Sequence, residues 1–137
     1  MYNLLTILKA ILRFIRGISD YVVEEGTSGI WTYIKWNSGK AECWGTKSLS
    51  STLSTAWGNS YISSKMARQS YPFTFAARPI EQVTIRASTS SAVWVTSDSN
   101  GNSMNTTTQT GMYFATREGS ASTHTLYFDY FVSGRWK

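Results

Sequence analysis

The chain has little of the side-chain chemistry that enzymes usually need. Its 137 residues include one cysteine, one histidine and two prolines. A single cysteine, Cys43, cannot form a disulfide within the chain or a multi-cysteine zinc site, and we expect it to be a small buried hydrophobe. No Cys–His, Ser–His–Asp or two-histidine arrangement is recognisable around His124. We therefore predict no catalytic residue, no metal site and no cofactor.

Charged residues are also scarce. Asp, Glu, Lys and Arg make up 15% of the chain, and the basic residues behind its net charge of +5 come singly outside the N-terminal segment. No nucleic-acid partner is expected, because no run of Lys and Arg forms a continuous stripe for phosphates. Aromatic residues, in contrast, reach 15%, and Ser, Thr, Gly and Asn are abundant after the first third. This mixture favours β-strands joined by tight turns.

Residues 1–19 differ in pattern from the rest of the chain. Their apolar side chains recur at intervals of three and four residues, which places two neighbouring apolar rows on one face of a helix. The segment Gly26-Thr27-Ser28-Gly29 then indicates a turn-rich boundary. We predict a helical stem at 1–19 and a β-sandwich tip domain at 20–137. The helix residues predicted to lie in an oligomer interface are Leu4, Ile7, Leu8, Ile11, Leu12, Phe14, Ile15 and Ile18.

Two hypotheses for this helix stay open. A membrane-spanning helix is not expected, because Lys9, Arg13 and Arg16 interrupt a stretch already shorter than the roughly 20 apolar residues that a bilayer needs. A secretory signal also fits poorly, since no small-residue cleavage site follows. The helix either buries its apolar face against copies of itself or lies on a membrane surface. The double row is wider than a dimer seam, which favours a bundle of three or more copies.

After residue 29 the apolar residues alternate, as is typical of strands. Residues 30–36 and 40–45 flank the turn Asn37-Ser38-Gly39, so they predict a β-hairpin. Further strands are predicted at 48–53, 61–62, 71–75, 82–87, 92–96, 112–117 and 124–132. Many short strands at this spacing indicate a mainly β fold, an antiparallel β-sandwich that is jelly-roll-like.

The predicted strand at 124–132 carries large apolar groups on both faces. Leu126, Phe128, Tyr130 and Val132 share one face. Tyr127 and Phe131 lie on the other, which must also be covered, and we assign them to the oligomer interface. A threefold axis can bury both the helix face and these two aromatic residues. The predicted assembly is therefore a homotrimer.

Parts of the sequence resemble a known family. The segments at 20–33 and 35–45, together with Tyr71-Pro72-Phe73 and Gly134-Arg135-Trp136, are similar to a C-terminal module of tail-associated structural proteins in phages and prophages of Gram-positive bacteria. The resemblance covers about residues 20–137. It implies a terminal domain of a tail-fibre, baseplate or head-fibre-like protein, assembled in the bacterial cytoplasm and exposed on the virion. Such modules are typically trimeric, contact other virion proteins and often engage the host surface. The resemblance carries no catalytic motif.

Attachment to a host would need side chains near loop ends. Residues 56–60 are expected to form a loop with an anchoring tryptophan, and residues 97–111 a polar hairpin or loop that projects from the body. Sugar recognition uses flat apolar faces beside planar hydrogen-bonding groups. The candidate receptor contacts of these types are Trp57, Trp94, Asp98, Asn100, Asn102 and Tyr113. A host cell-surface glycan is the partner that they indicate, and the competing interpretation of each tryptophan is a core or interface residue.

Two other functions compete with this one. The first is a membrane-associated protein that docks through the basic N-terminal helix. The second is a glycan-degrading enzyme whose carboxylate pair would come from Glu42, Glu81, Asp98, Glu118 and Asp129. Glycoside hydrolysis needs two carboxyl groups at a defined separation, and nothing in the spacing of these five favours it. The sequence therefore predicts a non-enzymatic appendage module.

Overall fold

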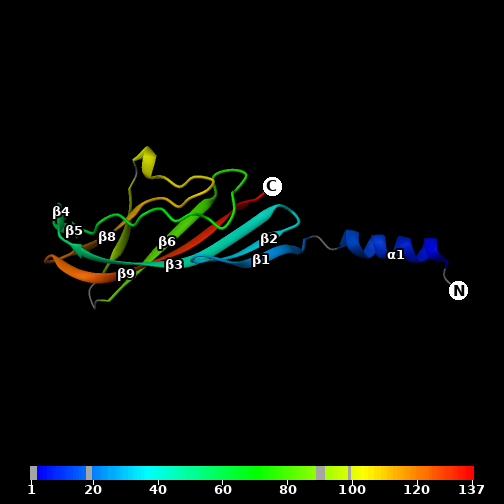
Figure 1. The fold of residues 1–137 in the computed structure, drawn as a ribbon, viewed down its shortest axis with the longest axis horizontal. Coiled ribbons are helices and arrows are strands. Elements are labelled where there is room, and N and C mark those ends of the chain that lie inside the picture. Colours follow the sequence, from blue (N-terminus) through cyan, green and yellow to red (C-terminus); the bar gives the residue numbers. More distant parts are fainter. Residues whose placement is uncertain (1–2, 18–19, 89–91, 99) are drawn as a thin grey trace.

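The computed structural model describes residues 3–17, 20–88, 92–98 and 100–137, and it consists of one helix and two antiparallel sheets (Figure 1). The elements are α1 (Leu4–Gly17), β1 (Val22–Ser28), β2 (Trp31–Trp36), β3 (Lys40–Leu53), β4 (Thr55–Trp57), β5 (Ser60–Ile62), β6 (Ile80–Ala87), β7 (Trp94–Ser97), a 3-10 helix (Gly101–Ser103), β8 (Tyr113–Glu118) and β9 (Ser122–Arg135). The predicted mainly β fold with a short N-terminal helix is confirmed.

The long strands β3 and β9 form the main strand pair of the five-stranded sheet. They pair antiparallel along their whole length, from Lys40 opposite Arg135 to Leu53 opposite Ser122. The first sheet has the order β1-β2-β3-β9-β6, and the second has the order β4-β5-β8-β7. The last strand of the chain, β9, therefore lies between the central strand β3 and the edge strand β6 and pairs with both.

The core lies between the sheets and is built by alternation along the strands. On β9 the residues predicted to face the core are buried, and Phe131 on the opposite face is exposed. The buried hydrophobic residues are Trp31, Ala41, Cys43, Leu53, Met66, Tyr71, Phe75, Ala115, Leu126, Phe128, Tyr130 and Val132. Burial of Cys43 agrees with its prediction as a small hydrophobe, and burial raises the pKa of its thiol to about 12.

The first hairpin is confirmed, with Gly39 in its turn at φ 94°, a left-handed conformation that glycine adopts without strain. The returning strand β3 is longer than expected, since it unites the predicted strands 40–45 and 48–53. Strand β1 was not predicted, because Gly26 sits within it and Glu24 and Glu25 break its apolar pattern. The segment forms a strand because it pairs with β2, and a strand at the edge of a sheet tolerates exposed polar side chains.

The predicted strand at 71–75 is wrong, because this stretch is irregular in the structure. Pro72 has no N–H for a ladder, and the N–H groups of Tyr71 and Phe75 donate instead to the carbonyls of Thr108 and Thr107, each at 2.9 Å. Residues 97–111 consequently do not project as a whole. Their first part, around the 3-10 helix, stands out, whereas Ser103, Thr110 and Gly111 are buried against the body.

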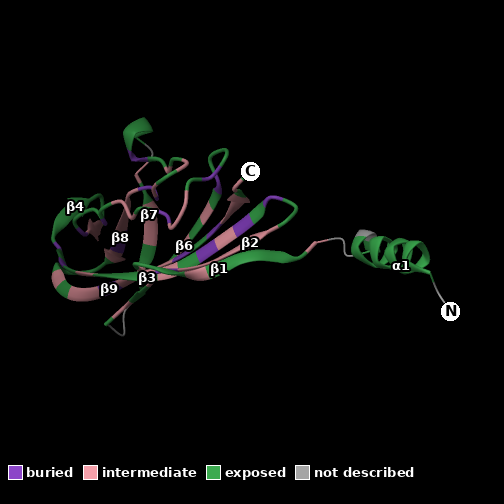
Figure 2. Cartoon of the chain, turned by 45° about the vertical axis from the view of Figure 1, so that its right-hand side comes forward, coloured by how far each residue is buried: buried purple, intermediate pink, exposed green. Residues whose placement is uncertain are grey.

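Helix α1 stands apart from both sheets (Figure 1). Asn3 caps it, since its Oδ1 accepts a hydrogen bond from the N–H of Thr6 at 2.8 Å. Residues 3–15 and Gly17 are exposed, including the apolar rows, as Figure 2 shows. Ile18 lies outside the described residues. Within the described part of the chain, no helix has the length and hydrophobicity needed to span a membrane.

Candidate functional site: two adjoining hollows at the end opposite the helix

The outer face of the four-stranded sheet carries a group of exposed and half-buried aromatic side chains. On β8, Ala115 faces the core, so its neighbours Phe114 and Thr116 lie on the other face of the sheet, where Phe114 is half-buried and Thr116 is covered. The strand pairing adds Thr96 opposite Phe114, and Trp94 opposite Thr116. Because β4 and β5 lie at the end of the molecule farthest from α1, the site is presented away from the helix (Figure 1).

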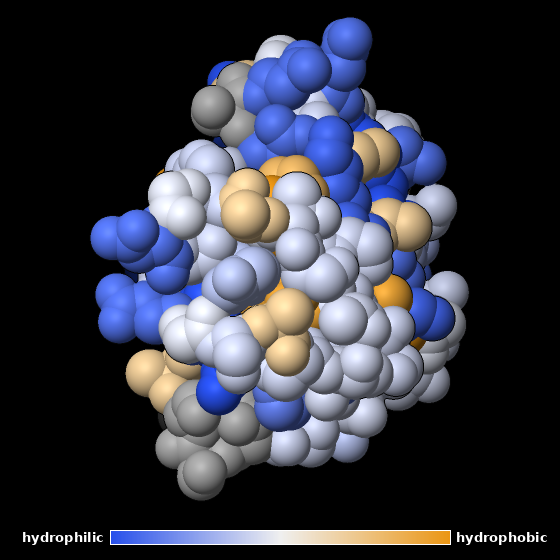
Figure 3. Space-filling view, turned by 90° about the vertical axis from the view of Figure 1, so that its left-hand side faces the viewer, coloured by the Kyte–Doolittle hydropathy of each residue, from blue (hydrophilic) through white to orange (hydrophobic). Residues whose placement is uncertain are grey.

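Side chains at this face surround a depression of about 380 Å³, which we call the Trp57 hollow. Its lining residues are Trp57, Ile62, Thr96, Ser97, Asp98 and Phe114. Trp57 ends β4 and is 57% exposed, so its ring is open to a ligand. Figure 3 looks onto this end of the molecule, where weakly polar residues cover most of the surface and small hydrophobic areas lie between them.

Asp98 forms part of the wall of this hollow and is held by three groups. Lys65 Nζ lies 2.5 Å from its Oδ2, the Ser103 hydroxyl donates to Oδ2 at 2.8 Å, and the N–H of Asn100 donates to Oδ1 at 3.2 Å. The lysine contributes most, followed by the serine, and together they lower the pKa of Asp98 to about 2. The carboxylate is therefore ionised, but its charge is matched by Lys65.

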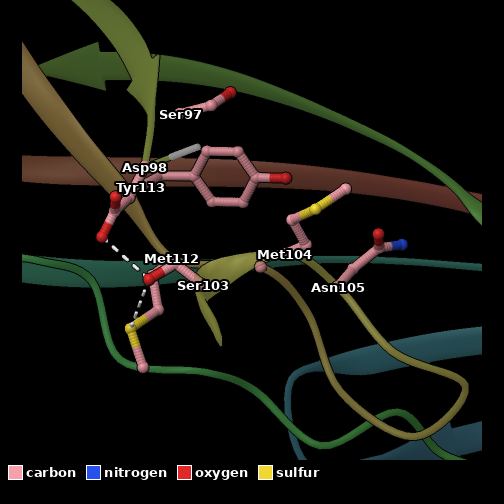
Figure 4. Close-up of a pocket in the computed structure, with 8 residues that line it drawn as sticks. Ser97, Asp98, Ser103, Met104, Asn105, Met112 and Tyr113 are labelled. Atoms are coloured by element: carbon pink, nitrogen blue, oxygen red, sulfur yellow. Dashed lines mark hydrogen bonds between the residues drawn. The ribbon is translucent and has the colours of Figure 1, made fainter. Parts of the chain in front are cut away.

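A second depression, of about 300 Å³, lies on the other side of Asp98 and is called here the Tyr113 hollow (Figure 4). Its lining residues are Ser97, Asp98, Ser103, Met104, Asn105, Gly111, Met112 and Tyr113. Ser103 bridges the wall, because its hydroxyl lies 2.8 Å from Asp98 Oδ2 and 3.9 Å from the sulfur of Met112. The two hollows thus share Ser97 and Asp98.

A half-buried carboxylate on β6 holds the Tyr113 hollow from behind. The hydroxyls of Tyr71 and Tyr113 donate to the two oxygens of Glu81, each at 2.5 Å, and the N–H of Gly111 donates at 3.0 Å. Burial raises the pKa of both tyrosines, and Glu81 raises it further. The hydroxyl of Tyr113 is therefore occupied by its hydrogen bond to Glu81, and the ring of Tyr113 faces the hollow.

The six predicted receptor residues are only partly brought together. Trp57 and Asp98 line the first hollow, and Tyr113 and Asp98 the second. Trp94 is 40% exposed on the same sheet face but lines neither hollow. Asn100 and Asn102 are exposed at the 3-10 helix, where the side chain of Asn100 accepts from the N–H of Asn102 at 3.1 Å. These two asparagines shape the turn beside the hollows.

Sequence analysis missed four lining residues of the Trp57 hollow, namely Ile62, Thr96, Ser97 and Phe114, and also Lys65, which pairs with Asp98. Alternation along β8 was the available signal for Phe114, because a residue next to a core-facing one must face outward. Lys65 has no such signal. It reaches the site from an irregular segment, where its Nζ lies 5.5 Å from the Phe114 ring centroid and pairs with Asp98.

The carboxylates considered for catalysis do not form a pair in the contacts of the described residues. Glu42 pairs with Lys40, Glu81 with the tyrosines, Asp98 with Lys65, and Asp129 with Arg86. None of these four shares a partner with another, and Glu118 is exposed at the end of β8. Among the described residues, no group of three or more His, Cys, Asp or Glu side chains could hold a metal ion.

The predicted interface residues on β9 lie on the outer face of the five-stranded sheet. Phe131 is opposite Trp44 of β3, and the two side chains are 40% and 37% exposed. Tyr127 is half-buried, since the guanidinium of Arg86 lies 5.2 Å from its ring centroid. Arg86 is itself held by both oxygens of Asp129, at 2.7 and 2.9 Å. This face combines an aromatic pair with a fixed ion pair.

No family model matches the chain, and no curated protein matches its sequence. Solved structures do match. The chain is similar to the C-terminal part of the R1 pyocin fibre of P. aeruginosa, with 14% identity, a TM-score of 0.56 and coverage of 91% of this chain. It is similar as well to an N-truncated R1-type pyocin tail fibre, with 13% identity and the same TM-score and coverage.

The chain spans 31% of the first of these structures and 94% of the second. At such identities the likeness concerns the fold alone. The expected resemblance to tail-fibre modules is therefore supported in fold, and the expected Gram-positive origin is not supported. The chain has the fold of a pyocin tail-fibre fragment.

Proposed function

We propose that this chain is a non-enzymatic tip module of a phage appendage of the tail-fibre kind, which acts as a homotrimer and attaches the particle to a glycan on the host surface. The observation that carries the proposal is the fold, which the chain shares over most of its length with tail-fibre fragments. In this role the protein is a virion component that is assembled in the bacterial cytoplasm, contacts other virion proteins and is exposed outside.

The exposed helix supports an oligomer. A helix of 14 residues is marginal alone in water, and the structure leaves its apolar rows uncovered within one copy. If copies buried roughly 500 Å² of this surface per chain, the transfer would contribute on the order of 12 kcal/mol before the entropy of association is subtracted. Residues 1–19 would then form a stem and residues 20–137 the tip domain.

The outer face of the five-stranded sheet supplies a second surface of the same kind. Phe131 and Trp44 lie side by side there and are exposed in one copy. Large aromatic side chains that are packed against a neighbour are typical of interface centres. A threefold axis would cover this pair and the helix face together, with Tyr127 near the edge of the contact.

The oligomer is tested by light scattering coupled to size-exclusion chromatography. The full chain is expected to run at three times its 15.4 kDa. Leu8→Glu, which places a charge in the apolar row, is expected to release monomers. Thr6→Glu, which places the same charge elsewhere on the exposed helix, is the matched control and should leave the mass unchanged. A monomeric mass for the unmodified chain at micromolar concentration would contradict the trimer.

The two hollows support attachment to a glycan. Trp57 offers an exposed ring and Asp98 an ionised hydrogen-bond acceptor beside it, which is the combination that sugars require. Binding of labelled full chain to whole bacterial cells, competed with glycan purified from the same cells, tests this part. Cell binding that the purified glycan does not reduce would mean that the receptor is something else.

A membrane-docked protein is the second candidate, and a specific observation favours it. Lys9 and Arg13 are exposed on the same helix whose apolar rows are uncovered, which is the pattern of a helix that lies on an anionic membrane. Flotation with anionic vesicles separates the two functions. A trimer with a buried helix face stays in solution, whereas a membrane-docked chain floats with the vesicles.

A further inference from the structure

The shared wall between the two hollows has a consequence for the size of the ligand. We infer that the Trp57 hollow and the Tyr113 hollow are adjoining subsites for one oligosaccharide of at least two sugar units, which lies across Ser97 and Asp98 and places an acidic sugar in the Tyr113 hollow. The inference rests on the proposed function in host attachment, and it adds the length and charge of the glycan.

The first subsite is suited to the apolar face of a sugar ring. Trp57, Ile62 and Phe114 supply apolar surface, and Thr96 supplies a hydroxyl. The Thr96 hydroxyl also contacts that of Thr116 at 2.6 Å, so its position is fixed by the sheet. The described residues that line this hollow include no Lys or Arg, and the nearby Lys65 is paired with Asp98. A neutral sugar unit therefore fits here.

The second subsite differs in chemistry. Met104, Met112 and the ring of Tyr113 supply soft apolar surface, and Asn105 and Ser97 supply polar groups. The amide of Asn105 donates to the carbonyl of Pro79 at 2.9 Å, so the loop that bears it is held against the body. Figure 4 shows the Tyr113 ring, Met104 and Asn105 around the same open space.

Charge decides which kind of sugar this second hollow prefers. Two arginines lie beside Met104, a lining residue of this hollow. The half-buried Arg68 donates to the carbonyls of Met104 at 2.8 Å, Thr110 at 2.9 Å and Asn102, and the Arg78 guanidinium lies 3.9 Å from the Met104 sulfur. Among the described residues, neither arginine is in an ion pair. Asp98 is matched by Lys65, and the carboxylate of Glu81 behind the hollow offsets one of the two arginines, so one positive charge is left over. A carboxylate or phosphate on the sugar would complement it.

Size favours a ligand that occupies both hollows. Each has a volume of about 300 or 380 Å³, near the lower end of the roughly 300–1,000 Å³ found for small-molecule sites. A single sugar in either hollow would make few contacts. When two units are linked, the second binds at a high effective concentration, which raises affinity by about 100-fold or more. A trimer would multiply this effect on a repetitive cell surface.

The test uses the full chain on an array of glycans of one to six units, with and without carboxylate or phosphate groups. The best glycan is then titrated by calorimetry against the unmodified protein and two variants. Trp57→Ala removes the ring of the first subsite, and Arg78→Gln removes the cation of the second. Each is expected to weaken binding about tenfold or more. Tyr21→Ala and Lys47→Gln, at an exposed aromatic and an exposed basic residue outside both hollows, are the matched controls, with thermal unfolding as a check on folding.

The outcomes separate this inference from the proposed function. Tightest binding by acidic glycans of two or more units, lost in both variants and kept in both controls, supports the two subsites. A neutral monosaccharide that binds as tightly as the longer acidic glycans overturns them, as does glycan binding that neither variant weakens, while attachment to a glycan stands in both cases. Binding to no glycan on the array overturns the glycan receptor and the subsites together.

Discussion

Gly45 lies where strand β3 passes close to the backbone of Ile30. A Cβ at this position would lie 2.1 Å from the carbonyl oxygen of Ile30, which is a backbone atom and cannot turn away. The glycine lies in the middle of the five-stranded sheet, opposite Trp31 on β2 and Tyr130 on β9. A side chain here would therefore push β3 away from the turn that leads into β2.

Gly45→Ala is expected to lower the free energy of unfolding by about 1–3 kcal/mol, the usual cost of overpacking a well-filled interior. Gly101→Ala is the matched control, because a Cβ there meets nothing within 4 Å. Urea unfolding followed by circular dichroism measures both. Equal stability of the two variants would show that the Gly45 contact is easily relieved.

Asp98 links the two hollows, and its ionisation can be followed directly. Its folded-state pKa of about 2 lies below the unfolded value of about 3.9. The ionised carboxylate therefore stabilises the folded state above about pH 4, and this contribution is lost as the pH falls through about 2. Carbon NMR of the Asp98 carboxyl should show a midpoint near 2, which moves upward in Lys65→Met.

Asp129 provides the control for that titration. Arg86 lowers its pKa through two hydrogen bonds, and Thr46 lowers it further. These groups belong to the five-stranded sheet, whereas Lys65 lies in an irregular segment. In Lys65→Met the midpoint of Asp129 should stay where it is. If the Asp98 midpoint is also unchanged, Lys65 is not what holds that carboxylate.

Strand β9 carries two phenylalanines with opposite roles. Phe128 is fully buried in the core, whereas Phe131 is 40% exposed beside Trp44. Phe128→Ala is expected to cost about 3–5 kcal/mol of stability because it leaves a cavity. Phe131→Ala should lower the stability of a single copy far less, but it should weaken the association of the copies.

Thermal unfolding of both variants at two protein concentrations distinguishes these effects. For Phe128→Ala the loss of stability should be similar at both concentrations. For Phe131→Ala the loss should be larger at the concentration where the unmodified chain is assembled. A large, concentration-independent loss in Phe131→Ala would place that side chain in the core of a single copy.

Elements with strong local patterns were predicted from the sequence, and those with weak patterns were not. The hairpin of β2 and β3 follows from alternation around a turn with glycine, and the alternation along β9 identifies its buried face. Strand β1 pairs with the next strand, β2, but its own apolar pattern is broken, so local periodicity could not assign it. The irregular stretch at 71–75 is held by carbonyls at Thr107 and Thr108, more than thirty positions away, which local periodicity cannot detect.

At the scale of the whole molecule, α1 and the sheets are separate bodies of structure, since the helix stands apart from both sheets. Removing residues 1–19 is therefore expected to leave the β-sheet signal in circular dichroism intact and the melting temperature at low concentration nearly unchanged. The shorter chain should also lose any dependence of melting temperature on concentration that comes from the stem. Unfolding of the shorter chain would show that the helix is needed for the body.

The sequence by itself determined the β class, the amphipathic helix, the burial of Cys43 and the two faces of β9, because each depends on residue type and on a local period of two or 3.6 residues. Only the tertiary structure decided that Asp98 separates two hollows, that Lys65 neutralises it and that Tyr113 is committed to Glu81. These contacts join residues that are far apart in the sequence. Tyr113 and Glu81 are separated by 32 positions, and Lys65 and Asp98 by 33 positions. The physical reason is that strand pairing between distant segments, led by β3 and β9, brings those side chains together, and such pairing leaves no local signature in the sequence.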